Sequence, residues 1–345
     1  MSGATTWNEL ISQPDAWLTL LDRLAAGTGL PSVSLADFDE VVMIGSGSSY
    51  YLALAAVDWV RRRHKILARA VPSCEVVLDQ NERTATLGPR RLVIAFSRSG
   101  ESTELLWALK AMQAAGNIVL GICCSERSSL LELADITWHI KEGHEDGLIM
   151  LRSFTSMLIA VQYMFGTSED RLQLRMLPQA AQDLLERSPE IHGLANRRPF
   201  DRFVFLASSS NYPIALEASL KIQEMSLSTS EAYHTLEYRH GPKATADAQT
   251  LVTLFTLSDP SHGLMLAKDL KALGVTLIVV GFGAELYQEI ADLTVSPGQE
   301  FTECASTAVA LLPAQLIAYY TAIRRGQNPD APTNLSKVVR LEVPA

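Results

Sequence analysis

Serine hydroxyls gather in a short segment that could bind an anion. Ser97, Ser99 and Ser102 follow an apolar run at Leu92–Phe96 and lead into a helical pattern over Ser102–Ala115. A buried strand that ends in a hydroxyl-rich turn at the start of a helix offers free backbone N–H groups, the positive end of the helix dipole and hydroxyl donors. The alternative is that Ser99 or Ser102 only caps the helix. Taken alone, the segment supports both interpretations equally.

A second serine-rich turn favours the anion site. Ser48 and Ser49 lie within Gly45–Tyr50, directly after the apolar run Val41–Ile44. In open α/β sheets ligands bind beyond the carboxyl ends of the strands, so both turns could converge on one ligand. The turn lacks the third glycine of a dinucleotide-binding fingerprint, and we therefore expect no dinucleotide site there.

Acidic and basic side chains recur at helical spacing in the second half of the chain. Glu217, Lys221 and Glu224 fall at i, i+4 and i+7 of a helical pattern that opens at Asn211. On spacing alone, the simpler interpretation is a solvated salt-bridge stripe worth about 0.3–0.5 kcal/mol per pair. The loop expected at Glu231–Pro242 weakens that interpretation, because its density of titratable groups is costly to order without a use.

Two histidines lie in that loop. His240 precedes a Gly-Pro turn that could aim its ring, whereas His234 could be a partly buried structural residue. The other histidines stand apart and give no metal-ligand spacing, so we expect no metal site and no cofactor. No nucleophile elbow or partnered cysteine indicates covalent acyl chemistry either.

Repeated strand and helix patterns must position these groups. Val41–Ile44, Leu92–Phe96 and Ile118–Ile122 predict strands, each followed by small residues and a helical pattern. The same order recurs about 160 residues later, which is natural for a duplicated domain. The fold class is therefore α/β, with a parallel sheet flanked by helices in each half. We expect three parts: a helical segment at 1–36, a first domain at 37–190, and a second domain at 195–345 that includes a C-terminal tail.

Bulk composition excludes several function classes. The 345 residues are 48% hydrophobic and carry a net charge of −9, so no net field attracts nucleic acid or an anionic membrane. The uncharged stretch Cys304–Ile323 contains several polar residues and predicts a buried helix rather than a membrane span. The four cysteines are too scattered for a disulfide framework, and we interpret them as buried thiols of a cytoplasmic protein.

Several motifs resemble the isomerase half of glucosamine-6-phosphate synthase, a double sugar-isomerase (SIS) domain protein. The match spans nearly the whole chain, and the motifs occur in family order. They are Ser97-Arg-Ser-Gly-Glu-Ser102, Tyr212-Pro-Ile-Ala-Leu-Glu217, Ala218-Ser-Leu-Lys-Ile-Gln-Glu224, Glu231-Ala-Tyr233, Glu237-Tyr-Arg-His-Gly-Pro242 and Asn334-Leu-Ser-Lys337. The resemblance implies two tandem SIS domains, each a flavodoxin-like three-layer αβα unit.

The resemblance also implies a set of residues that bind the substrate. They would hold the phosphate or lie beside the sugar, and they are Ser48, Ser49, Ser97, Arg98, Ser99, Ser102 and Glu145. Arg98 stands where the family has glutamine, so it could contact the phosphate or point to solvent. Met150, Leu151 and Arg152 replace a Ser-Thr-Lys sequence of the family. Because hydroxyls are lost there, the resemblance does not specify which sugar is recognised.

Three further residues match catalytic positions of the family. Glu224 would transfer a proton between C1 and C2, and Lys337 would contact the open-chain sugar. His240 would assist ring opening from the neighbouring subunit, which predicts a homodimer. Proton transfer beside a carbonyl needs a base whose pKa is raised towards neutrality, and a carboxylate on a buried helix face suits that requirement.

These inferences lead to one main hypothesis and two alternatives. The chain opens Met1-Ser2-Gly3 without a nucleophilic cysteine, so we expect it not to draw ammonia from glutamine by itself. The main hypothesis is an isomerase and deaminase that converts glucosamine 6-phosphate, or a close relative, to the ketose phosphate and releases ammonia. The alternatives are a deglycase for fructosamine 6-phosphate adducts and a non-catalytic sugar-phosphate sensor.

Overall fold

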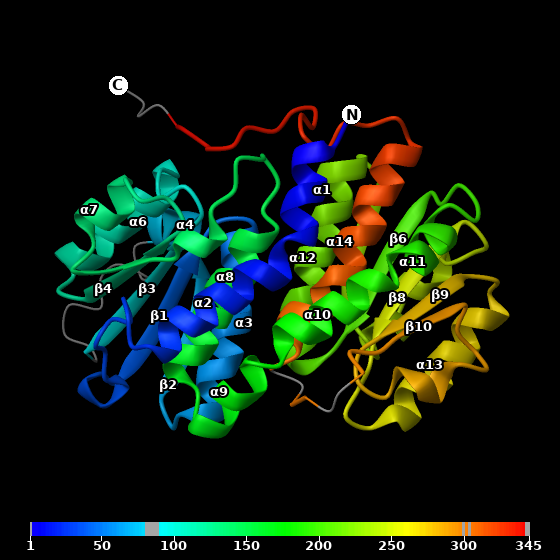
Figure 1. The fold of residues 1–345 in the computed structure, drawn as a ribbon, viewed down its shortest axis with the longest axis horizontal. Helices are drawn as coiled ribbons and strands as arrows, with labels where there is room; N and C mark the ends of the chain where they lie inside the picture. The colour runs from blue at the N-terminus through cyan, green and yellow to red at the C-terminus, as the bar shows by residue number, and fades with distance from the viewer. Residues whose placement is uncertain (1, 80–89, 299–300, 303–304, 342–345) are drawn as a thin grey trace. The chain divides into compact units, whose positions relative to one another are not determined.

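Two compact units make up the chain in the computed structural model, which describes residues 2–79, 90–298, 301–302 and 305–341. The first-sheet unit contains residues from Asp15–Asp146, Met150–Arg175 and Ser336 onward. The second-sheet unit contains the residues up to Pro14, Gly147–Ile149 and Met176–Leu335. Each unit is built around one sheet (Figure 1).

The first-sheet unit has five parallel strands in the order β2-β1-β3-β4-β5. Its strands are β1 (Glu40–Gly45), β2 (Leu67–Pro72), β3 (Arg91–Ser97), β4 (Ile118–Cys123) and β5 (Ile136–His139). Its helices are α2 (Gln13–Ala25), α3 (Ser48–Arg63), α4 (Ser73–Leu78), α6 (Thr103–Ala114), α7 (Ser129–Leu133), α8 (Arg152–Phe165) and α9 (Ser168–Leu174). Helices cover both faces of this sheet (Figure 1).

The second-sheet unit repeats the plan with the order β10-β9-β8-β6-β7. Its strands are β6 (Arg202–Ala207), β7 (Thr229–His234), β8 (Thr250–Phe255), β9 (Thr276–Val280) and β10 (Leu293–Val295). Its helices are α1 (Ala4–Ile11), α10 (Leu177–Glu186), α11 (Ser188–Ala195), α12 (Tyr212–Ser226), α13 (Pro260–Ala272) and α14 (Thr307–Arg324). The long helices α12 and α14 pack side by side.

The two sheets share one topology. Numbered within its own unit, each sheet has the strand order 2-1-3-4-5, which is the flavodoxin-like doubly wound order. The predicted fold class, two tandem α/β domains with parallel sheets, is therefore confirmed. In this order the chain reverses direction across the sheet between the first and third strands, so each unit has a topological switch point, at β1/β3 and at β6/β8.

The loop expected at Glu231–Pro242 is a loop only in part. Its first four residues belong to the edge strand β7, which pairs in parallel with β6. Polar side chains are tolerated there because an edge strand faces solvent on one side. The prediction failed because alternation on a half-exposed edge strand is too weak a signal to separate from a polar loop.

The prediction of uniformly buried cysteines is also wrong in one case. Cys74, at the start of α4, is exposed, while Cys123 and Cys124 at the end of β4 are buried. Cys304 lies outside the described residues. Residues before α3 do form the helices expected of the N-terminal segment, and α14 is the expected buried helix. No helix among the described residues is both long and apolar enough to cross a membrane.

The compact units do not follow chain order. The tail from Ser336 groups with the first sheet, and helices α10 and α11 group with the second. The boundaries predicted at 37–190 and 195–345 stay a prediction, because a compact unit and a domain of common ancestry need not end at the same residue.

The turn after β1 depends on glycine. A Cβ added to Gly45 would lie 2.4 Å from the backbone carbonyl carbon and oxygen of Ser49, so helix α3 could not start where it does. We expect Gly45→Ala to lower the free energy of unfolding by about 2–3 kcal/mol, measured by denaturant titration. Gly193→Ala in α11 is the control, because a Cβ there meets nothing within 4 Å. That substitution should stabilise the helix by about 0.5–1 kcal/mol; equal stability of both variants would contradict the packing argument.

Candidate functional site

The loop between β3 and α6 holds its own conformation through serine side chains. The Ser97 hydroxyl accepts a hydrogen bond from the Gly100 N–H at 2.8 Å, and the Ser99 hydroxyl accepts one from the Glu101 N–H at 3.2 Å. Ser102 occupies the N-cap position of α6, yet its side chain makes no capping hydrogen bond. The helix-cap alternative therefore does not account for these serines. The hydroxyls of Ser97 and Ser99 accept these bonds and retain their own protons to donate.

A buried thiol supports this loop from below. The Sγ of Cys123 donates to the carbonyl of Arg98 at 3.4 Å and lies 3.5 Å from the Ser128 hydroxyl, which donates to it. Gly100 has φ +72°, and a Cβ there would lie 2.5 Å from the Ser128 side chain, so only glycine fits. Burial raises the pKa of the Cys123 thiol, which leaves it protonated and unsuited to nucleophilic catalysis.

The two serine-rich loops flank the switch point of the first sheet. Strands β1 and β3 are parallel neighbours, with Ile44 opposite Ala95, so the turns that follow them open at the same edge. Ser48 and Ser49 begin α3, and both are only 5% exposed. This edge combines the starts of two helices with several hydroxyls, which is the arrangement that binds phosphate groups in doubly wound folds.

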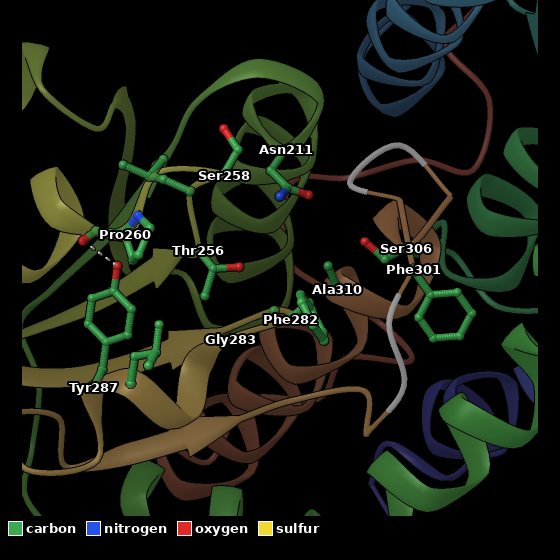
Figure 2. A pocket seen from close by; sticks show the side chains of 13 residues that line it. Asn211, Thr256, Ser258, Pro260, Phe282, Gly283, Tyr287, Phe301, Ser306 and Ala310 are labelled. Atoms are coloured by element: carbon green, nitrogen blue, oxygen red, sulfur yellow. Dashed lines mark hydrogen bonds between the residues drawn. The ribbon is translucent and has the colours of Figure 1, made fainter.

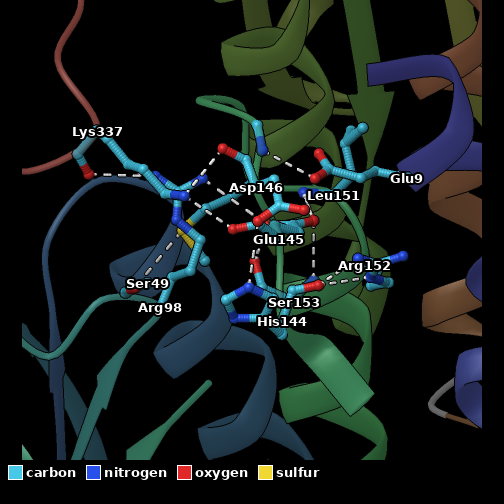
Figure 3. A network of polar contacts seen from close by, with 12 residues as sticks. Glu9, Ser49, Arg98, His144, Glu145, Asp146, Leu151, Arg152, Ser153 and Lys337 are labelled. Carbon is cyan, nitrogen blue, oxygen red and sulfur yellow. Dashed lines mark hydrogen bonds and ion pairs between the residues drawn. The ribbon is translucent and has the colours of Figure 1, made fainter. Parts of the chain in front are cut away.

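Glu145 holds the segment before α8 together (Figure 3). One carboxylate oxygen accepts from the backbone N–H of Leu151 at 2.7 Å and of Ser153 at 3.1 Å, and the other accepts from the Ser153 hydroxyl at 2.5 Å. Its side chain is fully buried, and a negative charge at the start of a helix is favourable. The carboxylate thus has partners within the chain, in a position that fixes the loop beside the serines.

Arg98 points to Glu145, so it does not simply point to solvent. Its guanidinium lies 3.8 Å from the Glu145 carboxylate and donates to the carbonyl of Lys337 at 3.2 Å (Figure 3). The ammonium of Lys337 in turn donates to the carbonyls of Glu145 and Asp146 at 2.8 and 2.9 Å. The tail is thereby fastened to the loop that also holds Arg98.

The C-terminal tail also reaches the start of α6. The N–H of Thr103 donates to the carbonyl of Val339 at 3.2 Å, and the N–H of Leu341 donates to the Thr103 hydroxyl at 3.0 Å. Sequence reasoning found Lys337 in the tail but missed Val339 and Leu341, because backbone contacts leave no signature in residue type. It also missed that the Ser49 hydroxyl lies 3.9 Å from the sulfur of Met150, one of the residues that replace the family's hydroxyls.

Glu217, Lys221 and Glu224 form a buried ion cluster on α12 instead of a solvated stripe. Lys221 and Glu217 are fully buried, 3.2 Å apart, and Lys221 also pairs with Glu224, whose side chain is 20% exposed. Burial by itself would lower the pKa of Lys221, but the two carboxylates outweigh burial and raise it. The ammonium therefore stays charged at neutral pH, with the Glu224 carboxylate as one of its partners.

The two histidines of the segment Glu231–Pro242 are both exposed. His234 ends β7 and is exposed, with its ring stacked on Tyr212 at 3.6 Å between centroids. His240 is exposed and follows a short 3-10 turn, Glu237–Arg239, where its backbone N–H donates to Glu237. Within the described parts of the chain, no group of three or more His, Cys, Asp and Glu side chains could hold a metal ion.

The predicted site residues thus fall into two sets. The first-sheet unit brings together Ser48, Ser49, Ser97, Arg98, Ser99, Ser102, Glu145 and Lys337 around the β1/β3 edge and its neighbouring loops. Glu224 and His240 belong to the second-sheet unit.

Comparisons with known proteins agree with this architecture. A family model described as the SIS domain matches residues 34–166 and 198–324. The isomerizing glutamine–fructose-6-phosphate aminotransferases of Xanthomonas campestris pv. campestris and Xylella fastidiosa strain Temecula1 are 28% and 30% identical to the chain. Each alignment covers 97% of this chain and 58% of the relative, so the chain spans little more than half the length of these proteins.

Solved structures give two further likenesses. The glucosamine-6-phosphate deaminase of Thermotoga maritima has a TM-score of 0.82 and 30% identity, over 98% of this chain and 100% of that one. The tagatose-6-phosphate ketose/aldose isomerase of Escherichia coli has a TM-score of 0.84 over 97% and 98% of the two chains. At 22% identity, the second likeness shows the fold alone.

The buried position of Glu145 makes its charge structurally necessary. In Glu145→Gln the amide can no longer accept from all of these donors, and Arg98 loses its ionic partner. We expect a loss of about 2–4 kcal/mol in the free energy of unfolding, measured by denaturant titration. The control is Asp146→Asn, because the Asp146 side chain is 88% exposed and its substitution should change stability by less than about 0.5 kcal/mol. Equal effects at the two positions would show that Glu145 does not organise the loop.

Proposed function

The chain belongs to the SIS domain family, and on that premise we propose that it catalyses the aldose–ketose isomerisation of a phosphorylated sugar. One observation gives this proposal its main support. Two serine-rich turns lie at the β1/β3 switch point of the first sheet, and the N-cap residue of the helix after each turn makes no side-chain capping bond. A phosphate held there would anchor the substrate away from its reacting carbons and so supply positioning energy.

The proposed substrate is an amino-sugar 6-phosphate, with glucosamine 6-phosphate as the first candidate. Support comes from the likeness to the Thermotoga maritima deaminase, which extends over nearly all of both chains at 30% identity. The aminotransferase relatives share the same region at a similar identity, and their names also refer to a hexose 6-phosphate. The activity proposed for this chain is isomerisation with release of ammonia.

Glu224 is the proposed base. It would remove the C2 proton of the open-chain aldehyde and leave an enolamine, and return of the proton to C1 would give a ketimine. Water then adds to the ketimine carbon, the C–N bond breaks, and ammonia leaves to give the ketose phosphate. The ion pair with Lys221 supports this role, because it fixes the position of the partly exposed carboxylate that must accept the proton.

The remaining residues have binding and positioning roles in this proposal. Ser97, Ser99 and Ser102, with Ser48 and Ser49, would donate hydroxyl protons to the phosphate. Arg98 and Glu145 contact each other, and Glu145 also accepts hydrogen bonds from the start of α8. We therefore assign both residues to positioning the segment before α8 beside the sugar. Lys337 would contact the open-chain sugar, and His240 would assist ring opening.

Removal of the carboxylate charge at Glu224 tests the mechanism. With glucosamine 6-phosphate as substrate, Glu224→Gln should lower both ammonia release and C2 proton exchange into deuterated water by at least about 10²–10⁴-fold, because the amide cannot accept the proton. Substrate affinity, measured by calorimetry, should change little. Glu237→Gln is the matched control, since Glu237 is an exposed carboxylate nearby in sequence.

Three outcomes would contradict the proposal in different ways. Equal, slow exchange in wild type and Glu224→Gln with intact binding would indicate a sensor. Turnover only of N-substituted amino sugars would indicate a deglycase. Isomerisation of a neutral hexose 6-phosphate without activity on glucosamine 6-phosphate would retain the reaction class and reject the amino sugar.

A homodimer with His240 acting in the partner's site is a further part of the proposal. His240 is exposed within the single chain, which leaves its ring accessible to a second copy. Each mixed dimer of a Glu224→Gln chain and a His240→Ala chain should therefore contain one complete site, and so recover up to about half the activity of a wild-type dimer, measured as ammonia release after subunit exchange. Each variant alone should remain impaired. No recovery despite proven exchange would place His240 in the site of its own chain.

A further inference from the structure

The second-sheet unit has a cavity at its own switch point. The cavity has a volume of about 280 Å³ and is lined by residues from the loops after β6, β8 and β9 and from the start of α14. Figure 2 shows the side chains of Asn211, Thr256 and Ser258 around this hollow. Because β6 and β8 correspond to β1 and β3, the cavity occupies the position that the serine-rich loops occupy in the other unit.

Asn211 is the most informative residue of the cavity wall. The residue is only 4% exposed, and its Oδ1 is buried without a hydrogen-bond partner. A buried polar atom without a partner costs about 1–3 kcal/mol, so such an atom at the wall of a cavity points to a ligand that completes it. Turning the amide would present a donor to the same space in place of an acceptor.

The helix starts around the cavity favour an anion. None of its described lining residues carries a formal charge. Helix α12 begins after Asn211, whose side chain makes no capping hydrogen bond, and α14 begins after Ser306. Both N-cap residues line the cavity, so the positive ends of two long helices face it. Helix α13 contributes less, because the carboxylate of Asp259 already accepts from its first turn.

The rest of the cavity wall favours a compact ligand with hydroxyl groups. Thr256 and Ser258 add hydroxyl groups, while Phe282, which is 49% exposed, and Leu286 give an apolar rim. Gly281 keeps this space open, since a Cβ there would lie 2.2 Å from the Thr256 hydroxyl oxygen. The volume lies just below the range of about 300–1,000 Å³ typical of ligand pockets, which fits one monosaccharide and excludes a dinucleotide.

We propose that this cavity is a second ligand site, which binds a small phosphate monoester of a sugar. The phosphate would lie against the starts of α12 and α14. The sugar hydroxyls would bond to Asn211, Thr256 and Ser258, with the apolar rim against the carbon skeleton. The site is separate from the serine-rich loops and does not depend on the isomerase reaction.

Two matched substitutions separate the sites. Ser102 and Asn211 both occupy N-cap positions, where aspartate is well tolerated, so Ser102→Asp and Asn211→Asp should fold and place a negative charge in one site each. Equilibrium dialysis with labelled fructose 6-phosphate should give two molecules bound per wild-type chain, one for each single variant and none for the double variant. Thr256→Val in the Ser102→Asp background should weaken the remaining binding by about tenfold or more.

The same assay contains the outcomes that would overturn the proposal. No binding to the Ser102→Asp variant, or unchanged binding to that variant after Asn211→Asp, would reject the second site. If inorganic phosphate bound as tightly as fructose 6-phosphate, the proposed recognition of the sugar would be wrong. If fructose bound as tightly as fructose 6-phosphate, the proposed recognition of the phosphate would be wrong. Binding that persists in Ser102→Asp and disappears in Asn211→Asp would support the cavity even if the serine-rich loops bound nothing.

Discussion

Parallel strand pairing is the constraint on which the rest of this structure depends. Parallel neighbours cannot be joined by a short hairpin, so each strand is followed by a crossover, and the turns that leave the strands gather at one edge of the sheet. Where the crossovers change direction, between β1 and β3 and between β6 and β8, two turns diverge and leave room for a ligand. The location of both candidate binding sites follows from this rule, and the residue types in the turns decide what each can bind.

Buried charge is the second theme, and Lys221 and Glu145 are both matched by partners. Lys221 is fully buried but has two carboxylates beside it, and Glu145 is fully buried but accepts three hydrogen bonds from the start of α8 and pairs with Arg98. Such groups are costly to desolvate, and they hold a geometry that apolar packing would leave less specified. In both cases the ordered group lies next to a residue proposed to meet the substrate.

The sequence was most informative where a pattern is long or repeated. The central strands and the duplication could be predicted because fully buried parallel strands form continuous apolar runs, and β1, β3 and β4 contain the predicted runs Val41–Ile44, Leu92–Phe96 and Ile118–Ile122. The edge strands β2, β5, β7 and β10 were not identified, since short strands at a sheet edge lack that signal. The proposed phosphate loop could be located from its serines, whereas the intrachain role of Glu145 could not, because burial and backbone donors are properties of the folded chain.

The cavity at β6/β8 shows the limit of residue-type reasoning most clearly. Asn211 and Thr256 are unremarkable in the sequence, and only their positions after β6 and in line with β8 make them equivalent to Ser49 and Ser97. A comparison of the two halves by strand position, instead of by residue identity, would have found them.

Helix α12 has a consequence of its own. It begins at the wall of the cavity, next to Asn211, and carries Glu224 near its other end, about 20 Å further along a helix that rises 1.5 Å per residue. A continuous α-helix is a rigid secondary element of the kind that carries energetic coupling between distant sites. If occupancy of the cavity alters the affinity at Glu224 by some factor, thermodynamic reciprocity requires that substrate alter the affinity of the cavity by the same factor. Helix α12 would then couple a ligand site at its start to the proposed base near its end.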